Sequence, residues 1–304
     1  MELVLYYVLS FCMFSTICLS WPLASTDVDN GINPEINFNQ TLVKYNLTAF
    51  RGLLIQVKLF EKLMDTRVSY TVFAPTNEAI ANAKSLLANA TRLPEVMMYH
   101  IHAGSFKTSN IHSDMRLETL LGKQKKIRLE RYNGLFYGSC QQFGKVLDWT
   151  YDSGLLNTMN GVMNPPEGNF YDILKATAAY SSFLSYVNTG GLQDLMNLQS
   201  PMTLLLPNNA AFAKLPTSVK EKMQSSYQFT RHVLQYHVVT EIVCASVFDT
   251  GTVPTYEGSN IEVNVSGNKV VFNGKAALIQ ADTIAYNGVI QVIDTVLLPP
   301  SDLV

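Results

Sequence analysis

Apolar positions along the chain follow a helical period in some segments and a strand period in others. A short apolar stretch, Val72-Phe73 or Leu204-Leu205-Leu206, runs into a proline, and Thr76 or Asn208 then supplies a helix N-cap. Apolar residues at helical spacing follow at Ala79, Ile80 and Ala83 in one place and at Ala211, Phe212 and Leu215 in the other. The pattern therefore predicts strand, turn and helix twice.

Later segments alternate instead. Ile261, Val263 and Val265 alternate with Glu262 and Asn264, which predicts a strand with one solvent-facing side. Asn273-Gly274 and Asn287-Gly288 are typical of hairpin turns, and the nearly all-apolar Val289–Val292 predicts a strand buried on both faces. Because helices come early and strands late, we expect an α+β fold with a mixed sheet or sandwich.

Three sequence blocks occur twice in the same order. Ser69–Ile80 matches Pro201–Phe212, and Thr71 and Thr203 lie 132 positions apart. Tyr99 and Tyr236 open similar Tyr-His blocks, and Ser153–Pro166 aligns with Asn287–Pro300. Ordered recurrence at nearly one spacing indicates a tandem of two similar units.

Composition agrees with a folded chain and excludes two classes. Of its 304 residues, 47% are hydrophobic and 15% charged, too apolar for a disordered chain. The formal charge of −2 excludes a nucleic-acid binder that works by bulk charge.

The N-terminus resembles a secretory leader. Leu3–Ser20 carries no charge and precedes a polar stretch, so residues 1–24 are predicted to be a signal peptide, cleaved after Ser20 or Ala24. A positive n-region is missing, which leaves an uncleaved signal anchor as the alternative. No second apolar run is long enough to span a bilayer. We therefore expect a secreted protein of the extracellular space or matrix, with no membrane span after cleavage.

Cysteines and sequons bear on the same compartment. Cleavage would remove Cys12 and Cys18 and leave Cys140 and Cys244, for which a disulfide and two free thiols both remain open. Four Asn-x-Ser/Thr sequons predict N-glycosylation at Asn39, Asn46, Asn89 and Asn264.

Together, the three repeated blocks resemble fasciclin domains. The closing block Asn287–Pro300 is a close copy of the family pattern, whereas the first unit departs from it at Ser153, Asn157 and Asn160. The resemblance implies two domains, residues 36–166 and 167–301, each a β-sandwich-like wedge with several helices packed on it. It also implies a role in extracellular adhesion, as in matrix proteins of the periostin and keratoepithelin type.

The same resemblance implies receptor contacts. Integrin recognition is attributed in the family to the Tyr-His stretch and to an Asp-Ile-aliphatic tripeptide before the closing block. Neither unit keeps the full tripeptide: Asp282-Thr283-Ile284 stands in one and Asp148-Trp149-Thr150 in the other. The candidates carried over are Tyr99, His100, Asp148, Tyr236, His237, Asp282 and Ile284. The alternative interpretation is that these are packed histidines, core aromatics and turn aspartates.

A basic run stands out in the first unit. Lys123, Lys125, Lys126, Arg128 and Arg131 are opposed within the run only by Glu130. On a strand, Lys126 and Arg128 share one face while Ile127 and Leu129 turn to the core. The run is a candidate glycosaminoglycan site, or else a solvated strand edge that lysines protect from aggregation.

Motifs of catalysis are missing from the sequence: it has no Gly-x-Ser-x-Gly, P-loop or His-Glu-x-x-His pattern. His100, His102 and His112 have metal-like spacing, but Val239 takes the second position in the sister unit, so we expect no metal.

We thus expect a non-enzymatic adhesion or matrix protein without cofactors. Its expected partners are matrix proteins, cell-surface receptors such as integrins, and glycosaminoglycan, and not nucleic acid. A carrier that holds an apolar ligand in a domain cavity is the alternative.

Overall fold

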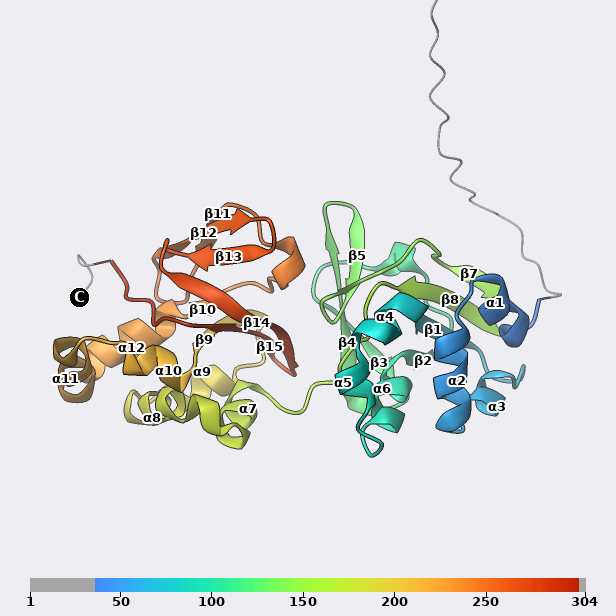
Figure 1. Cartoon of the computed structure of the whole chain (residues 1–304), viewed down its shortest axis with the longest axis horizontal. Coiled ribbons are helices and arrows are strands. Elements are labelled where there is room, and N and C mark those ends of the chain that lie inside the picture. Colours follow the sequence, from blue (N-terminus) through green and yellow to red (C-terminus); the bar gives the residue numbers. More distant parts are fainter. Residues whose placement is uncertain (1–35, 301–304) are drawn as a thin grey trace, which may run out of the picture. The chain divides into compact units, whose positions relative to one another are not determined.

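A computed structural model describes residues 36–300 of the chain (Figure 1). Within these residues, both repeats belong to one compact unit. The expected signal peptide, with Cys12 and Cys18, lies outside the described residues. Among residues 36–300, no helix is long and apolar enough to cross a membrane.

The first repeat starts with short helices and ends with strands, as the pattern predicts. In chain order its elements are α1 (Phe38–Lys44), α2 (Thr48–Gln56), α3 (Phe60–Leu63), β1 (Tyr70–Pro75), α4 (Asn77–Asn82), α5 (Lys84–Leu87), α6 (Leu93–Tyr99), β2 (Ile101–Ala103), the 3₁₀ helix η1 (Thr108–Asn110), β3 (Met115–Thr119), β4 (Gly122–Tyr132), β5 (Leu135–Gly138), β6 (Gln141–Gln142), β7 (Trp149–Tyr151) and β8 (Gly154–Met159).

The second repeat follows the same order. Its elements are α7 (Phe170–Ala176), η2 (Ala178–Tyr180), α8 (Ser181–Thr189), α9 (Gln193–Asn197), β9 (Met202–Pro207), α10 (Asn209–Ala213), α11 (Thr217–Ser225), α12 (Tyr227–Tyr236), β10 (Val238–Val239), η3 (Ala245–Val247), β11 (Gly251–Pro254), β12 (Asn260–Ser266), β13 (Lys269–Phe272), β14 (Ala276–Ala285) and β15 (Gly288–Ile293).

A parallel strand pair lies at the centre of each repeat. In the first repeat β1 pairs in parallel with β8 within the order β2-β1-β8-β7, and a second sheet runs β3-β4-β5-β6. In the second repeat β9 pairs in parallel with β15, and the longer β14 joins both parts into one seven-stranded sheet. The expected mixed sheet is confirmed in both.

Local signals in the sequence explain the element boundaries. The side chains of Thr76 and Asn208 accept hydrogen bonds from the amides of Ala79 and Ala211, which confirms both predicted N-caps. Asn273 and Gly274 both have positive φ in the β13–β14 turn, as a tight hairpin requires. The β14–β15 turn lies at Tyr286 and Asn287, one residue before the predicted Asn287-Gly288, because Gly288 already pairs with Ala285 as the first residue of β15.

The central strands are buried on both faces, which divides each core into two layers. In the second repeat, Leu204, Leu206 and Ile290 pack on the helical side, whereas Leu205 and Ile293 pack between the strands. The first repeat has the same two clusters, one against its helices and one around Phe73. Successive side chains of a central strand point alternately to the helices and to the outer strands. The central sheet therefore packs against both layers at once.

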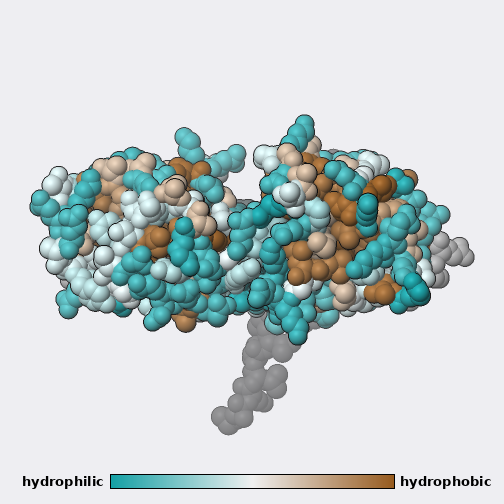
Figure 2. All heavy atoms as spheres, turned by 90° about the horizontal axis from the view of Figure 1, so that it is seen from below, coloured by the Kyte–Doolittle hydropathy of each residue, from teal (hydrophilic) through white to brown (hydrophobic). Residues whose placement is uncertain are grey.

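The surface of the two repeats differs. In the view of Figure 2, hydrophobic residues gather into a patch on the first repeat, whereas on the second repeat they are scattered among residues of intermediate and hydrophilic character. Ile55, Val43 and Val68 are among the exposed large hydrophobic side chains of the first repeat. The repeats thus share a fold but differ on the face seen in this view.

Gly288 lies where the central strands β9 and β15 approach each other closely. A Cβ placed on Gly288 would lie 2.0 Å from the carbonyl oxygen of Met202 in the paired strand. We therefore expect Gly288→Ala to lower the free energy of unfolding by about 1–3 kcal/mol in urea titrations, because the parallel pair must move apart. Gly251→Ala, with open space around its Cβ, is the matched control. Equal stability of both variants would contradict the prediction.

Candidate functional site

The Tyr-His blocks place both histidines inside the protein. His100 and His237 follow the ends of α6 and α12 and are 0% exposed. Each Nδ1 lies 2.7 Å from a carbonyl oxygen one turn earlier, that of Val96 or Val233. Each Nε2 accepts the amide of Met163 or Leu297 at 3.0 Å. The partners assign a neutral imidazole with its proton on Nδ1, and the interpretation of packed, hydrogen-bonded histidines is confirmed.

Tyr99 and Tyr236, the last residues of α6 and α12, form hydrogen bonds on the strand side of the same helix ends. Tyr99 is fully buried, and its hydroxyl donates to the carbonyl oxygen of Lys126 at 2.8 Å. Tyr236 donates to the carbonyl oxygen of Asn260 at 3.0 Å. Burial raises the pKa of both phenols. Both tyrosines therefore connect a helix end to a strand of the outer layer.

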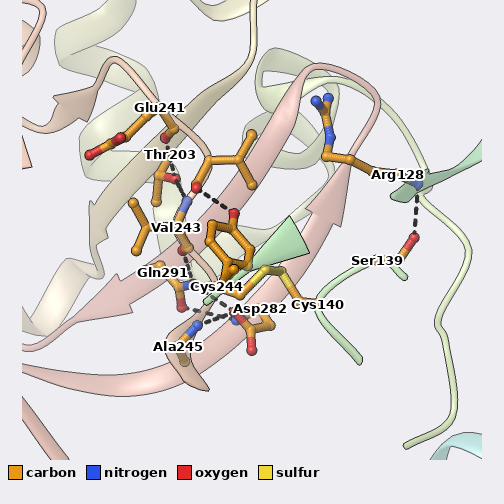
Figure 3. The surroundings of a disulfide bond; sticks show 12 residues. Arg128, Ser139, Cys140, Thr203, Glu241, Val243, Cys244, Ala245, Asp282 and Gln291 are labelled. Atoms are coloured by element: carbon orange, nitrogen blue, oxygen red, sulfur yellow. Dashed lines mark hydrogen bonds between the residues drawn. A yellow bond between two sulfur atoms is a disulfide. The ribbon is translucent and has the colours of Figure 1, made fainter. Parts of the chain in front are cut away.

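Asp148 and Asp282 perform the same structural task in the two repeats. Each has positive φ, and each carboxylate accepts the amide at the start of a short 3₁₀ helix: Thr108 at 2.9 Å in one repeat and Ala245 at 2.8 Å in the other. The aspartate's own amide donates to a side-chain amide oxygen on the central strand, that of Asn157 or Gln291. Burial raises the pKa of Asp282. The two carboxylates therefore fix a loop against the central sheet (Figure 3 shows that of Asp282).

Asn157 in the first repeat forms fewer hydrogen bonds than its counterpart Gln291 in the second. Gln291 donates from Nε2 to the Asp282 carboxylate at 2.7 Å and to the Val243 carbonyl at 3.0 Å. Asn157, one methylene shorter, leaves its Nδ2 without a partner among residues 36–300. The sequence difference at this position, which departs from the family pattern, thus weakens one of the two networks.

Ile284 is 8% exposed and packs with Ile242 and Val289. The seven receptor candidates are therefore bound into the interior or into loop networks in this structure. Their receptor role stays a prediction, and a substitution at any of them acts on the fold as well as on a contact.

Two threonines outside the predicted site residues complete these networks. Thr71 and Thr203 lie on central strands, and each hydroxyl donates to a loop carbonyl, Gly104 or Glu241, while accepting the amide of Phe106 or Val243. The available signal was their identical place in the first repeated block. A polar residue kept in an otherwise apolar strand indicates such a partner.

Cys140 and Cys244 form a disulfide, the pairing that the sequence left open (Figure 3). Their Cα atoms lie 5.3 Å apart, and the bond connects the first repeat to the second across 104 positions. Nearby, the Tyr132 hydroxyl donates to the carbonyl oxygen of Ile242 at 2.7 Å. The two repeats are thus linked covalently as well as through the chain.

The basic run lies on β4, as expected, but its members differ in environment. Ile127 and Leu129 are fully buried, which confirms the predicted inward face. Lys125 pairs with Glu95 at 3.0 Å and Lys126 with Glu118 at 3.5 Å, and Arg128, only 5% exposed, pairs with Asp114. The remaining two, Lys123 and Arg131, are exposed.

The four sequons also differ in accessibility. Asn46 and Asn89 are exposed, whereas Asn39 and Asn264 are half-buried. Asn264 lies beside Glu262 on the solvent-facing side of β12, where the alternation placed it. Asn39 lies in α1 and accepts a hydrogen bond from Arg51 at 2.6 Å. Asn46 and Asn89 are therefore the more accessible acceptors.

The metal alternative has little to support it. His100 uses both ring nitrogens in protein hydrogen bonds, and Nδ1 of His102 lies 2.7 Å from the Glu118 carbonyl oxygen. Within residues 36–300, Cys140, Cys244 and Asp282 form a group of metal-ligand type, but both sulfur atoms are in the disulfide.

Comparison with known proteins agrees with this geometry. The family model for the fasciclin domain matches residues 45–165 and 178–299, one match in each repeat. The chain belongs to the fasciclin-domain family. The boundary near residues 166 and 167 stays a prediction, as do the domain ends at 36 and 301.

Relatives cover both fasciclin domains. The chain is 29% identical to the pig (Sus scrofa) transforming growth factor-beta-induced protein ig-h3 over 279 residues, 89% of this chain and 41% of that protein. It is 26% identical to human (Homo sapiens) periostin over 253 residues, 80% of this chain and 30% of periostin. The chain thus spans less than half the length of these relatives. A solved fasciclin domain pair from the insect cell adhesion molecule Fasciclin I aligns with a TM-score of 0.43 at 18% identity, covering 86% of this chain and all of that one.

The buried histidines predict acid sensitivity. Burial lowers the pKa of His100 and of His237 from 6.5 to about 4. Below pH 6.5 the unfolded chain binds protons at these imidazoles that the folded chain does not bind. The free energy of unfolding should therefore fall as pH is lowered towards 4, by about 1.4 kcal/mol per pH unit for each histidine.

Urea titrations between pH 7.5 and 5 measure this dependence. The exposed His112→Gln variant is the control and should keep the wild-type dependence, whereas His237→Asn should reduce it in the second domain. An unfolding free energy that stays constant over this range would contradict the prediction.

Proposed function

We propose that this protein is exported and acts as an adhesion or matrix protein through contacts with other macromolecules, without catalytic turnover. The observation that carries the proposal is the match of both repeats to fasciclin domains. The titratable side chains singled out from the sequence support it as well. His100, His237 and Asp282 are engaged in internal hydrogen bonds and do not converge on a cleft.

Two linked domains suit weak, repeated contacts. Each domain offers its own surface, and the Cys140–Cys244 bond adds a second link between them. When both surfaces engage one matrix or cell layer, the second contact forms at a high effective concentration. Proposed partners are matrix proteins, cell-surface receptors such as integrins, and sulfated glycosaminoglycan.

An integrin contact would need an accessible carboxylate. A carboxylate completes the oxygen shell of a bound divalent cation, and Asp282 is the proposed donor in the second domain. Its Oδ1 is occupied by Ala245 and Gln291, so that Oδ2 is the atom offered for this role. Asp148 is the counterpart in the first domain.

The carrier hypothesis needs a closed, aromatic-lined cavity. Two grooves in residues 36–300 are both open to solvent. One is lined mainly by basic and amide side chains and the other by hydroxyl-bearing side chains of α8. These grooves do not favour an apolar ligand.

Cell spreading tests the receptor proposal. Cells on wells coated with the mature chain should spread in the presence of Mg²⁺ and should fail to spread with EDTA. Asp282→Asn keeps an acceptor oxygen for Ala245 but removes the charge, so it should reduce spreading at a temperature at which thermal unfolding shows the variant to be folded. Asp249→Asn, exposed in the same domain, is the matched control. Equal spreading on both variants would remove Asp282 from the receptor site.

Export is testable separately. Expressed in a secreting eukaryotic cell, the chain should appear in the medium with its N-terminus after Ser20 or Ala24 and should gain mobility on glycosidase treatment. Asn89→Gln should remove one glycan, because Asn89 is exposed. Retention in the membrane fraction with residues 1–24 intact would support the signal-anchor alternative instead.

A further inference from the structure

A groove of about 350 Å³ lies beside the basic run and takes residues from both fasciclin domains. Its charged lining residues are all basic: Arg116 on β3 and Lys123, Lys126 and Arg128 on β4. The second domain contributes Gln199 and Tyr286. Its volume falls in the range of roughly 300–1,000 Å³ found for small-molecule sites.

Strand register explains why the cations gather. Arg116 pairs directly with Arg128 across β3 and β4, so both side chains emerge on one face with Lys126. Like charges opposite each other on a sheet are unfavourable, and a carboxylate only partly compensates them. The Asp114 carboxylate forms ion pairs with both arginines, and its distance to the Arg116 guanidinium is 3.9 Å. The Glu118 carboxylate forms an ion pair with Lys126.

The charge balance leaves the groove positive. Four cations face it, and Asp114 and Glu118 are the carboxylates paired with them. Lys123 is exposed and has no ion pair within the part of the chain that the structure describes. An anion bound here would relieve the repulsion between the paired arginines, while the amide of Gln199 and the hydroxyl of Tyr286 can donate hydrogen bonds to it.

We propose that this groove binds a sulfated segment of a glycosaminoglycan, with Arg116 and Lys126 as its principal cationic contacts and Gln199 and Tyr286 as contacts from the second domain. The inference rests on the proposed glycosaminoglycan function and adds to it a defined site. Sulfate groups on a flexible polysaccharide match several partly exposed cations along one strand pair.

Binding at this groove is expected to depend on the Cys140–Cys244 disulfide. Because the groove needs both domains, the Cys140–Cys244 bond, which links them near β5 and η3, supports its lining. A contact made by β4 alone would not depend on the bond. Binding by the Cys140→Ser/Cys244→Ser double variant should therefore be weaker than wild-type binding.

The test is titration calorimetry of the full mature chain with a heparin-derived octasaccharide. Wild type should bind at low ionic strength, and the affinity should fall steeply with added salt. Arg116→Gln/Lys126→Gln should raise the dissociation constant at least about fivefold, and Gln199→Ala/Tyr286→Phe at least about twofold, since charge-assisted contacts exceed neutral ones. Lys62→Gln/Lys84→Gln, exposed cations of α3 and α5, is the charge-matched control.

The outcomes separate the groove from the wider function. If Lys125→Gln/Arg131→Gln, two members of the basic run that do not line the groove, weakens binding while Arg116→Gln/Lys126→Gln matches the control, glycosaminoglycan binding stands and the groove is wrong. Equal binding of desulfated octasaccharide overturns the sulfate chemistry. Failure of wild type to bind any octasaccharide overturns both. Thermal unfolding of each variant verifies that it is folded.

Discussion

Both domains depend on satisfying backbone groups that are buried against the central strands. The parallel pairs β1–β8 and β9–β15 are covered on both faces, so loops and helix ends that cross them lose contact with water. Each unpaired buried N–H or C=O costs free energy, and side chains from the central strands and helix ends supply the partners. Thr71, His100 and Asp148, with their counterparts in the second domain, are these partners.

This constraint explains why the repeated motifs are repeated. The Tyr-His block, the threonine of the opening block and the aspartate before the closing block hold the same hydrogen bonds in both domains. A residue that both domains need for folding is kept in both, whatever each domain binds. Positions at which the domains differ, such as the basic strand pair β3–β4, are therefore further candidates for recognition beside the shared aspartates.

The Cys140–Cys244 disulfide adds a covalent link between the two domains. It joins a turn after β5 to the loop before η3, beside the Asp282 network that orders this loop. In the unfolded chain such a cross-link removes conformational freedom, and in the folded chain it keeps residues of both domains within one site. The groove lined by Arg116 and Lys126 of the first domain and by Gln199 of the second takes residues from both of the domains that this bond links.

The sequence by itself determined the local structure and the repeat. Proline and Asn-Gly signals, the caps at Thr76 and Asn208, and the all-apolar closing strand depend on residues close in the chain, so periodicity and turn chemistry suffice to find them. The blocks also identified the fasciclin family, which the match to both repeats confirms.

Only the tertiary structure decided which polar residues face inward and which distant residues meet. It paired Cys140 with Cys244 and placed the candidate histidines in buried hydrogen-bond networks. It also placed Arg116 beside Arg128, in a groove that Gln199 lines as well. The physical reason is that hydrogen-bond satisfaction, burial and charge compensation are set by neighbours in space. A one-dimensional pattern gives the period of a strand but not the partner across from it.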